Sequence, residues 1–172
     1  MKQNKTFEYS KEERINDLLY WIWNFQLQTK RLIESTNREW SIAEKDAIEK
    51  KKIYAATSFD EHILTVVLGN ISRAIKSYNE IAKEGKIELT NRMATVYLRN
   101  IYEHWDESRI KNDSQSLDKL MVIHPSSKPF SITYTNDDWL LAGEFSLTSI
   151  SKELEDIEKE CLLTLNYEPE KN

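Results

Sequence analysis

The scarcity of residues that end helices is the feature that most constrains how this chain can fold. Its 172 residues include only three glycines and three prolines. Two of the prolines, Pro125 and Pro129, fall within one short stretch. Because glycine and proline mark most turns, a chain with so few of them favours long helices with few joints. The sequence therefore predicts an all-α fold class.

Apolar residues recur at helical spacing in four segments. A capping box at Ser-Lys-Glu-Glu places the first helix start near Ser10, and the stripe continues to about Glu34. The expected helices cover residues 10–34, a segment from about residue 64 to a C-cap near Gly85, residues 90–110 with Asn91 and Arg92 in the first turn, and residues 147–165. Residues 35–52 are expected to be a loop with some helix, and residues 111–116 a polar loop. Trp21 and Trp23 lie off the stripe of the first helix, so they are expected to be partly exposed or to meet a partner helix.

Residues 120–142 have a different character. Three short runs favour β-structure, and they are Met121–Ile123, Phe130–Tyr134 and Trp139–Leu141. Residues 135–138 form a good turn, so a small β-hairpin is expected between the third and last helices. Four helices joined in this way predict an up-down bundle. We expect one domain over residues 1–166 and a disordered tail over residues 167–172.

Charge and composition exclude several classes of protein. The net charge of −5 argues against a non-specific nucleic-acid binder, so no DNA partner is expected. The one cysteine, Cys161, excludes an internal disulfide and fits a reducing compartment. The first residues lack the apolar run of a signal peptide, and the apolar stretches are too short to cross a bilayer. A cytoplasmic protein without a membrane partner is expected.

Residues 95–109, TVYLRNIYEHWDESR, concentrate polar groups on one expected helix. On a helical wheel with Leu98 at zero, Ala94, Ile101 and Trp105 form the core stripe. The polar residues fall ~100–240° away, on the back of the helix, and they are Arg99, Asn100, Glu103 and His104.

The same back face also carries apolar residues, namely Met93, Val96 and Tyr97. An ordinary solvent face carries lysines and glutamates more often, so this mixture indicates a second contact surface, such as another subunit. A simpler interpretation stays open. Arg99 and Glu103 are four residues apart and can pair across an ordinary polar helix face.

The stretch Arg99-Asn100-Ile101-Tyr102-Glu103-His104 resembles the RNase motif of HEPN domains, in which a His follows an Arg after four to six residues. The longer run from Leu98 to Glu107 also resembles a variant found in small bacterial HEPN-like proteins. The resemblance implies a helical bundle that forms a homodimer, with two Arg-His pairs in a cleft between the subunits.

The same resemblance implies an endoribonuclease that cuts RNA without a metal or other cofactor, as a toxin or phage-defence effector with an antitoxin or another protein as partner. His104 would move a proton and Arg99 would stabilise charge on the phosphate, with Asn100 and Glu103 in support. Because Arg99 and His104 lie ~140° apart on one helix, a site paired across a dimer is expected. The alternative is a non-catalytic HEPN-like helical module for dimerisation or for protein or nucleotide binding.

Other candidate residues carry weaker signals. His62, His104 and His124 lack the spacing of a metal site, so no metal is expected. Cys161 lies on a Leu/Ile stripe and is interpreted as a buried hydrophobe. Arg73 and Lys76 can lend positive charge near the motif or simply belong to a solvated face.

Overall fold

The computed structural model describes residues 9–41, 46–82, 85–103, 114–124, 132–135 and 137–165. These residues form five helices and one three-stranded antiparallel sheet. The prediction of a mainly helical chain is confirmed. Within the described ranges, none of the helices has the length and apolar character needed to span a membrane.

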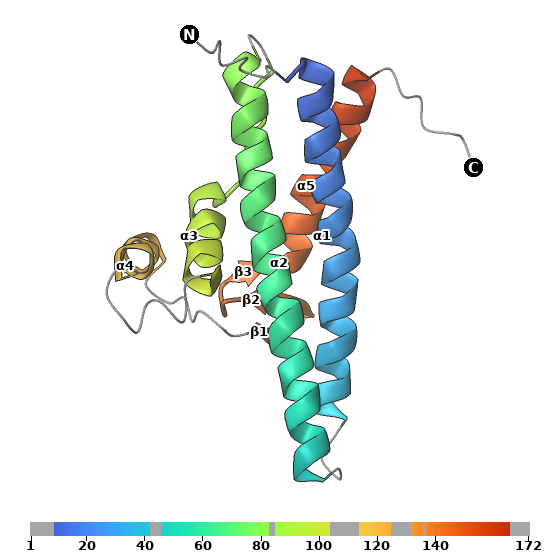
Figure 1. Ribbon diagram of the computed structural model, residues 1–172, viewed down its shortest axis with the longest axis vertical. Helices are drawn as coiled ribbons and strands as arrows, with labels where there is room; N and C mark the ends of the chain where they lie inside the picture. Colours follow the sequence, from blue (N-terminus) through green and yellow to red (C-terminus); the bar gives the residue numbers. More distant parts are fainter. Residues whose placement is uncertain are drawn as a thin grey trace, which may run out of the picture.

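Two long helices, α1 (Lys11–Trp40) and α2 (Ala47–Ile81), lie side by side and form the axis of the molecule (Figure 1). The Ser10 side chain accepts a hydrogen bond from the Glu13 amide, and the Glu13 carboxylate accepts one from the Ser10 amide, which confirms the predicted capping box. Asp46 caps α2 by accepting from the amides of Ile48 and Glu49.

The expected loop over residues 35–52 is therefore wrong. Helix α1 continues to Trp40 and α2 begins at Ala47, which leaves a connection of only residues 41–46. The apolar pattern weakens there because polar side chains occupy the contact between the helices, not because the helices end. Ser35, Thr36 and Thr57 are all buried, and each hydroxyl donates to a carbonyl of its own helix.

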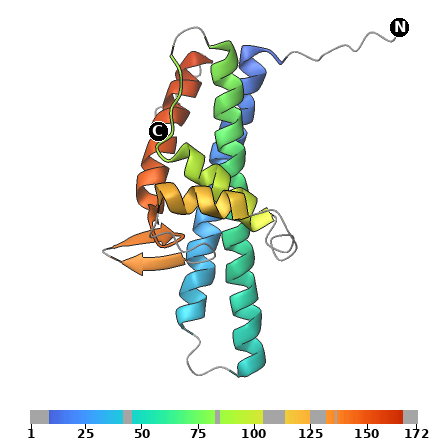
Figure 2. The same ribbon diagram turned by 90° about the vertical axis from the view of Figure 1, so that its left-hand side faces the viewer.

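The contact between α1 and α2 changes character along its length. In the trunk half, which comprises residues 11–27 and 62–81, the buried side chains are mainly large and apolar, for example Leu18, Ile22, Phe25, Leu68 and Ile75. In the tip half, which comprises residues 28–40 and 47–61, polar groups take their place. Gln28 Nε2 donates to the Asp60 carbonyl at 3.0 Å and to its carboxylate at 3.1 Å. Both views show α1 and α2 extending past the ends of α3 and α5 at this tip (Figures 1 and 2).

Helix α3 (Arg92–Glu103) packs against α2 and is followed by α4 (Ser114–Ile123). The chain leading into α3 is fixed by Asn79, whose side-chain amide exchanges two hydrogen bonds with the backbone of Ile87. Asn91 has φ 60°, so it precedes the helix and does not lie in its first turn as predicted. Residues 104–110, which were expected to continue this helix, lie outside the described residues.

Helix α4 corrects the expected count of four helices. Met121–Ile123 is the end of this helix and not a β-strand. Its axis crosses α2 at a steep angle in Figure 2. A helix of ten residues with three consecutive exposed apolar residues has little amphipathic pattern, which is why its periodicity did not reveal it.

The predicted hairpin is confirmed as β1 (Ile132–Thr135) and β2 (Asp138–Leu141), which pair antiparallel, with Thr135 opposite Asp138. A third strand, β3 (Phe145–Ser146), adds to β2 and leads directly into α5 (Leu147–Thr164). The predicted apolar stripe of the last helix is buried at Leu147, Ile150, Leu154, Ile157 and Cys161, and its last member, Leu165, follows α5 and is half-buried.

Helix α5 packs along the trunk half of α1. The Trp23 indole donates to Glu158 Oε1 at 2.6 Å, and Gln26 Nε2 donates to Glu158 Oε2 at 2.9 Å. Trp21 packs partly buried against the core and Trp23 is 49% exposed, in agreement with their positions off the main stripe. The expected tail over residues 167–172 lies outside the described residues.

Candidate functional site

Helix α3 is buried on two sides. Ala94, Leu98 and Ile101 are buried in the core, which confirms the predicted stripe, and Trp105 lies outside the described residues. Beside this stripe, the Thr95 hydroxyl lies 2.6 Å from the Ser72 hydroxyl of α2, and both residues are fully buried. Small side chains on both helices therefore let α3 approach α2 closely.

Arg99 lies in this contact with α2. A Cβ atom added to Gly69 of α2 would lie 2.5 Å from Arg99 Cδ, 2.7 Å from its Cβ and 2.8 Å from its Cγ. The aliphatic stem of Arg99 thus packs on the bare backbone of Gly69, and its Nε atom is buried. The prediction that Arg99 belongs to the back of its helix, away from the core, is wrong. Its position ~100° from Leu98 puts it at the side that α2 covers.

Asn100 is the one supporting residue whose side chain is described. Its Oδ1 accepts a hydrogen bond from Arg99 Nη1 at 3.3 Å, and both residues are half-buried. Asn100 therefore contacts the guanidinium directly. His104 and the side chain of Glu103 lie outside the described residues, so the expected Arg99–Glu103 pair and the catalytic role of His104 stay predictions.

A second arginine, Arg92, lies on the same side of α3. Arg92 precedes Arg99 by seven residues, or about two helical turns. Its Nη1 lies 3.5 Å from the Ser72 carbonyl, so Arg92 also borders the seam with α2. Lys76, one turn beyond Ser72 on α2, is exposed, as is Arg73. The seam between α2 and α3 thus carries two arginines, Arg92 and Arg99, in a chain that is acidic overall.

The three expected dimer-face residues differ in exposure. Met93 is 45% exposed, whereas Val96 and Tyr97 are half-buried. Helix α4 lies against α3, and a groove runs between the two helices. The lining residues are Met93, Tyr97, Asp118, Lys119, Val122 and Ile123. Val122 is 79% exposed, so the apolar surface of α3 continues onto α4, which sequence reasoning missed.

The other candidates are placed on separate elements. His62 lies half-buried in α2, and His124 follows α4, where its Nδ1 lies 3.1 Å from Glu144 Oε1 and its ring packs edge-on against Phe145. Across the described residues, no three histidines, cysteines or carboxylates gather in a way that could hold a metal ion. Burial raises the pKa of the Cys161 thiol to about 11, which makes it a poor nucleophile at neutral pH.

Comparisons with family models, with curated proteins and with solved structures found no match to this chain.

The contact with Gly69 could have been suspected from the sequence, because a glycine inside a long helical stripe often marks a close approach of another element. That Arg99 is the residue packed on this glycine is a matter of tertiary structure, and the sequence pattern does not show it.

Proposed function

We propose that this chain is a HEPN-like, metal-independent endoribonuclease, acting as a toxin or phage-defence effector through Arg99 and His104 from each of two paired copies. The observation that carries the proposal is the fixed position of Arg99. Its stem is held by Gly69 and its guanidinium by Asn100. A guanidinium positioned in advance can stabilise charge on a phosphate at little further cost in ordering.

The reaction follows from the two side chains. A ribose 2′-hydroxyl attacks the neighbouring phosphorus while the His104 imidazole accepts its proton. The bond from phosphorus to the 5′ oxygen breaks, and that oxygen takes up a proton. The products are a cyclic phosphate and a free 5′-hydroxyl. Arg99 stabilises the additional negative charge on the phosphate oxygens during attack.

The hydrogen bond from Arg99 to Asn100 supports a role for Asn100 in orienting the guanidinium. Arg92 supports RNA binding further along the same seam by attracting a second phosphate. On the helical wheel expected from the sequence, Arg99 and His104 are ~140° apart, so we propose that the paired copy supplies the histidine for each arginine.

The test measures cleavage of a labelled RNA in EDTA by the full chain and by three variants. We expect His104→Ala to lower the rate at least ~100-fold, because it removes the group that moves the proton. Arg99→Met keeps an aliphatic stem on Gly69 and removes the guanidinium with its hydrogen bond to Asn100, so it should lower the rate without unfolding the chain. Arg73→Ala removes an exposed cation of α2 and is the matched control, expected to cleave nearly as wild type does. Equal cleavage by wild type and His104→Ala, or none by either, would reject the proposal.

A second candidate is a non-catalytic HEPN-like module that associates with a second copy of itself. The observation favouring it is the apolar surface of α3 and α4, where Met93, Met121, Val122 and Ile123 are all exposed. Asp118 and Lys119 lie beside each other at the edge of this surface. In a two-fold contact, Asp118 of each copy can face Lys119 of the other copy, which gives two ion pairs.

Light scattering at rising concentration tests this candidate. Val122→Asp should convert a wild-type dimer to a monomer, because it buries a charge in an apolar contact. Leu163→Asp changes another exposed apolar residue, on α5, and should leave the dimer intact. A monomeric wild type at all concentrations would exclude self-association. A dimer in which His104→Ala abolishes RNA cleavage would instead favour the enzyme.

A further inference from the structure

The outer face of α1, on the side opposite its buried residues Leu18 and Ile22, carries a group of exposed apolar side chains. Tyr20 is 53% exposed, Trp23 49% and Leu27 60%. At ~100° per residue these three side chains fall within ~60° of one another around the helix, so they form one patch. Tyrosine and tryptophan are enriched in protein interfaces, and a patch that contains both indicates a contact surface.

Two of the three side chains of this patch are held in place within the chain. The Trp23 indole donates to Glu158 Oε1 of α5 at 2.6 Å, which satisfies its polar end. The Tyr20 ring meets the Trp21 ring edge-on, with 5.1 Å between the ring centroids. A partner that covers rings fixed in this way removes little further side-chain freedom, so the cost of forming the contact is small.

On the N-terminal side of the patch, the outer face of α1 is acidic. It carries three exposed carboxylates, Glu12, Glu13 and Asp17. The cations of the same turns, Lys11 and Arg14, contact α2 instead, where Lys11 lies over an aromatic ring and Arg14 donates hydrogen bonds. The positive charges of these turns therefore lie away from the outer face.

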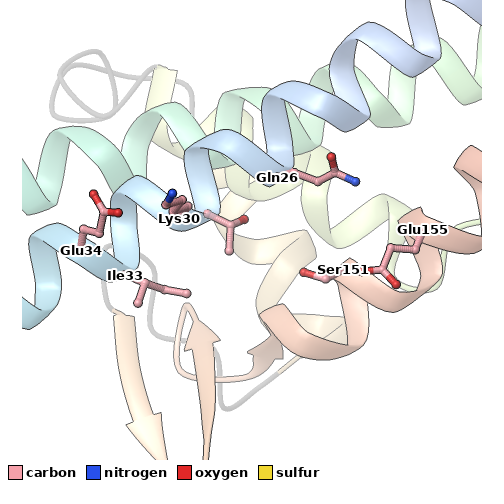
Figure 3. Close-up of a pocket in the computed structure, with 7 residues that line it drawn as sticks. Gln26, Lys30, Ile33, Glu34, Ser151 and Glu155 are labelled. Atoms are coloured by element: carbon pink, nitrogen blue, oxygen red, sulfur yellow. The ribbon is translucent and has the colours of Figure 1, made fainter. Parts of the chain in front are cut away.

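On the C-terminal side of the patch, the same face is basic. Lys30, Arg31 and Arg38 are exposed, against one exposed carboxylate, Glu34. Arg31 also pairs with the Asp60 carboxylate of α2 at 3.3 Å. Figure 3 shows Lys30 and Glu34 on consecutive turns of α1, beside the groove between α1 and α5. An acidic end, an apolar middle and a basic end thus follow one another along one helix face.

We propose that this face of α1 binds the same face of a second copy of the chain, with the two α1 helices antiparallel about a two-fold axis. The axis passes halfway between Tyr20 and Leu27, so that Tyr20 of each copy packs on Leu27 of the other. Asp17 precedes Tyr20 by three residues, and Lys30 follows Leu27 by three residues. The same register therefore puts Asp17 of each copy opposite Lys30 of the other, which gives two ion pairs.

The distribution of charge favours a second copy in the antiparallel orientation. A partner with charge of one sign complements only one end of this face, whereas a second copy complements both. In a parallel two-fold pair each residue faces its own counterpart, so Asp17 would face Asp17 and Lys30 would face Lys30. Like charges placed opposite each other disfavour that arrangement.

This contact is separate from the Arg99 region. Figures 1 and 2 show α3 on the side of α2 away from α1. Two copies that meet through α1 therefore leave the apolar surface of α3 and α4 accessible. A chain that also self-associates through that second surface forms assemblies larger than a dimer.

Sedimentation velocity of the full chain at rising concentration tests the contact. Leu27→Asp should lower the association constant at least ~10-fold, because it places a charge in the apolar middle of the contact. Asp17→Lys should lower it by a similar factor, since it replaces two attractive pairs by two repulsive ones. Adding Lys30→Asp to Asp17→Lys exchanges the two charges and should restore association to within ~3-fold of wild type. All three positions are exposed, and circular dichroism checks that the variants fold.

Glu34 provides a test in the opposite direction. Glu13 precedes Tyr20 by seven residues and Glu34 follows Leu27 by seven, so the proposed register places these two carboxylates opposite each other. Glu34→Gln removes this repulsion and should strengthen association about two- to fivefold. Weaker association in Glu34→Gln would contradict the register.

Leu163→Asp, at an exposed apolar position of α5, is the control for Leu27→Asp and should associate as wild type does. A wild type that is monomeric at all concentrations would overturn the proposal, as would a double variant that associates no better than Asp17→Lys alone. Association that Val122→Asp abolishes and Leu27→Asp leaves unchanged would overturn it too, because the copies would then meet through α3 and α4. The RNA cleavage test changes none of the residues of the α1 face, so its outcome is independent of this one.

Discussion

A glycine in the middle of a helix usually lowers stability by about 1 kcal/mol relative to alanine. Gly69 nevertheless occupies the centre of α2, and it is buried. The reason is the Arg99 stem, whose Cβ, Cγ and Cδ atoms all occupy the space that an alanine methyl group would need. Glycine at this position therefore determines how closely α3 approaches α2.

Replacing Gly69 with alanine should destabilise the chain despite the better helix propensity of alanine. A methyl group 2.7 Å from Arg99 Cβ forces the α3 backbone to move, and such overpacking costs about 1–3 kcal/mol. We expect a net loss of about 1 kcal/mol in the free energy of unfolding, measured by urea denaturation. Ser58→Ala, at an exposed position of α2, is the control and should be neutral or slightly stabilising. A Gly69→Ala variant more stable than wild type would show that the two helices are not in close contact.

The candidate site was predictable only in part at the level of residues. The spacing of Leu98, Ala94 and Ile101 correctly identified the core stripe, because one helix face is a local property of the sequence. The helical wheel could not show whether a neighbouring helix covers Arg99, because it considers α3 alone. In the structure α3 is flanked by both α2 and α4, so only one of its sides contacts neither the core nor another helix. Which flank is covered depends on the Gly69 contact, which is 30 residues away along the chain.

At the level of elements, Asp138 joins the sheet to α5. Its Oδ1 accepts hydrogen bonds from the Trp139 amide, the Thr148 amide and the Thr148 hydroxyl, and its Oδ2 accepts from the Ser146 hydroxyl. Burial raises the pKa of Asp138, but these hydrogen bonds together outweigh it and hold the pKa below its ordinary value of 3.8. The charged carboxylate thus fixes the β2 strand against the first turn of α5.

This arrangement predicts a pH-dependent stability. Because the Asp138 pKa is lower in the folded chain than in the unfolded chain, its contribution is present above about pH 4 and is lost as the pH falls through the folded value. Asp138→Asn should lower the free energy of unfolding by about 1 kcal/mol at pH 7, a discounted value because solvent screens this half-buried group. Thermal unfolding should show a smaller difference from wild type at pH 3.

Asp137→Asn provides the matched control for this experiment. Asp137 is exposed in the same turn and has φ 61°, a conformation that asparagine also tolerates. Its effect should be near zero at both pH values. An Asp138→Asn difference that is equally large at pH 3 would mean that the charge of Asp138 contributes nothing.

The elements themselves were predictable where their signals are local. The Ser10 capping box, the β1–β2 turn and the stripe of α5 each depend on residues within a few positions, and the structure confirms all three. Helix α4 was missed because Met121, Val122 and Ile123 form a continuous apolar run, which is typical of a strand when read alone.

At the scale of the whole molecule, the scarcity of glycine and proline correctly indicated long helices. Helix α2 has 35 residues and so a length of about 52 Å. The lengths of these helices were underestimated because the sequence analysis identified helices by regularly spaced apolar residues. In the tip half the two helices meet through polar contacts instead, such as Gln28 with Asp60. Polar pairs are visible only once the two helices are placed side by side.

Because the trunk half of α1 and α2 is apolar and the tip half is polar, the two halves should differ in how readily they open. Burial of large apolar side chains contributes most of the free energy that resists opening, and the tip half has few of them. Amides of residues 28–40 and 47–61 should therefore exchange with deuterium through local opening, well before those around Ile22 and Ile71. The molecule would then behave as a stable bundle with a tip that opens locally. A bound partner could fix the conformation of that tip.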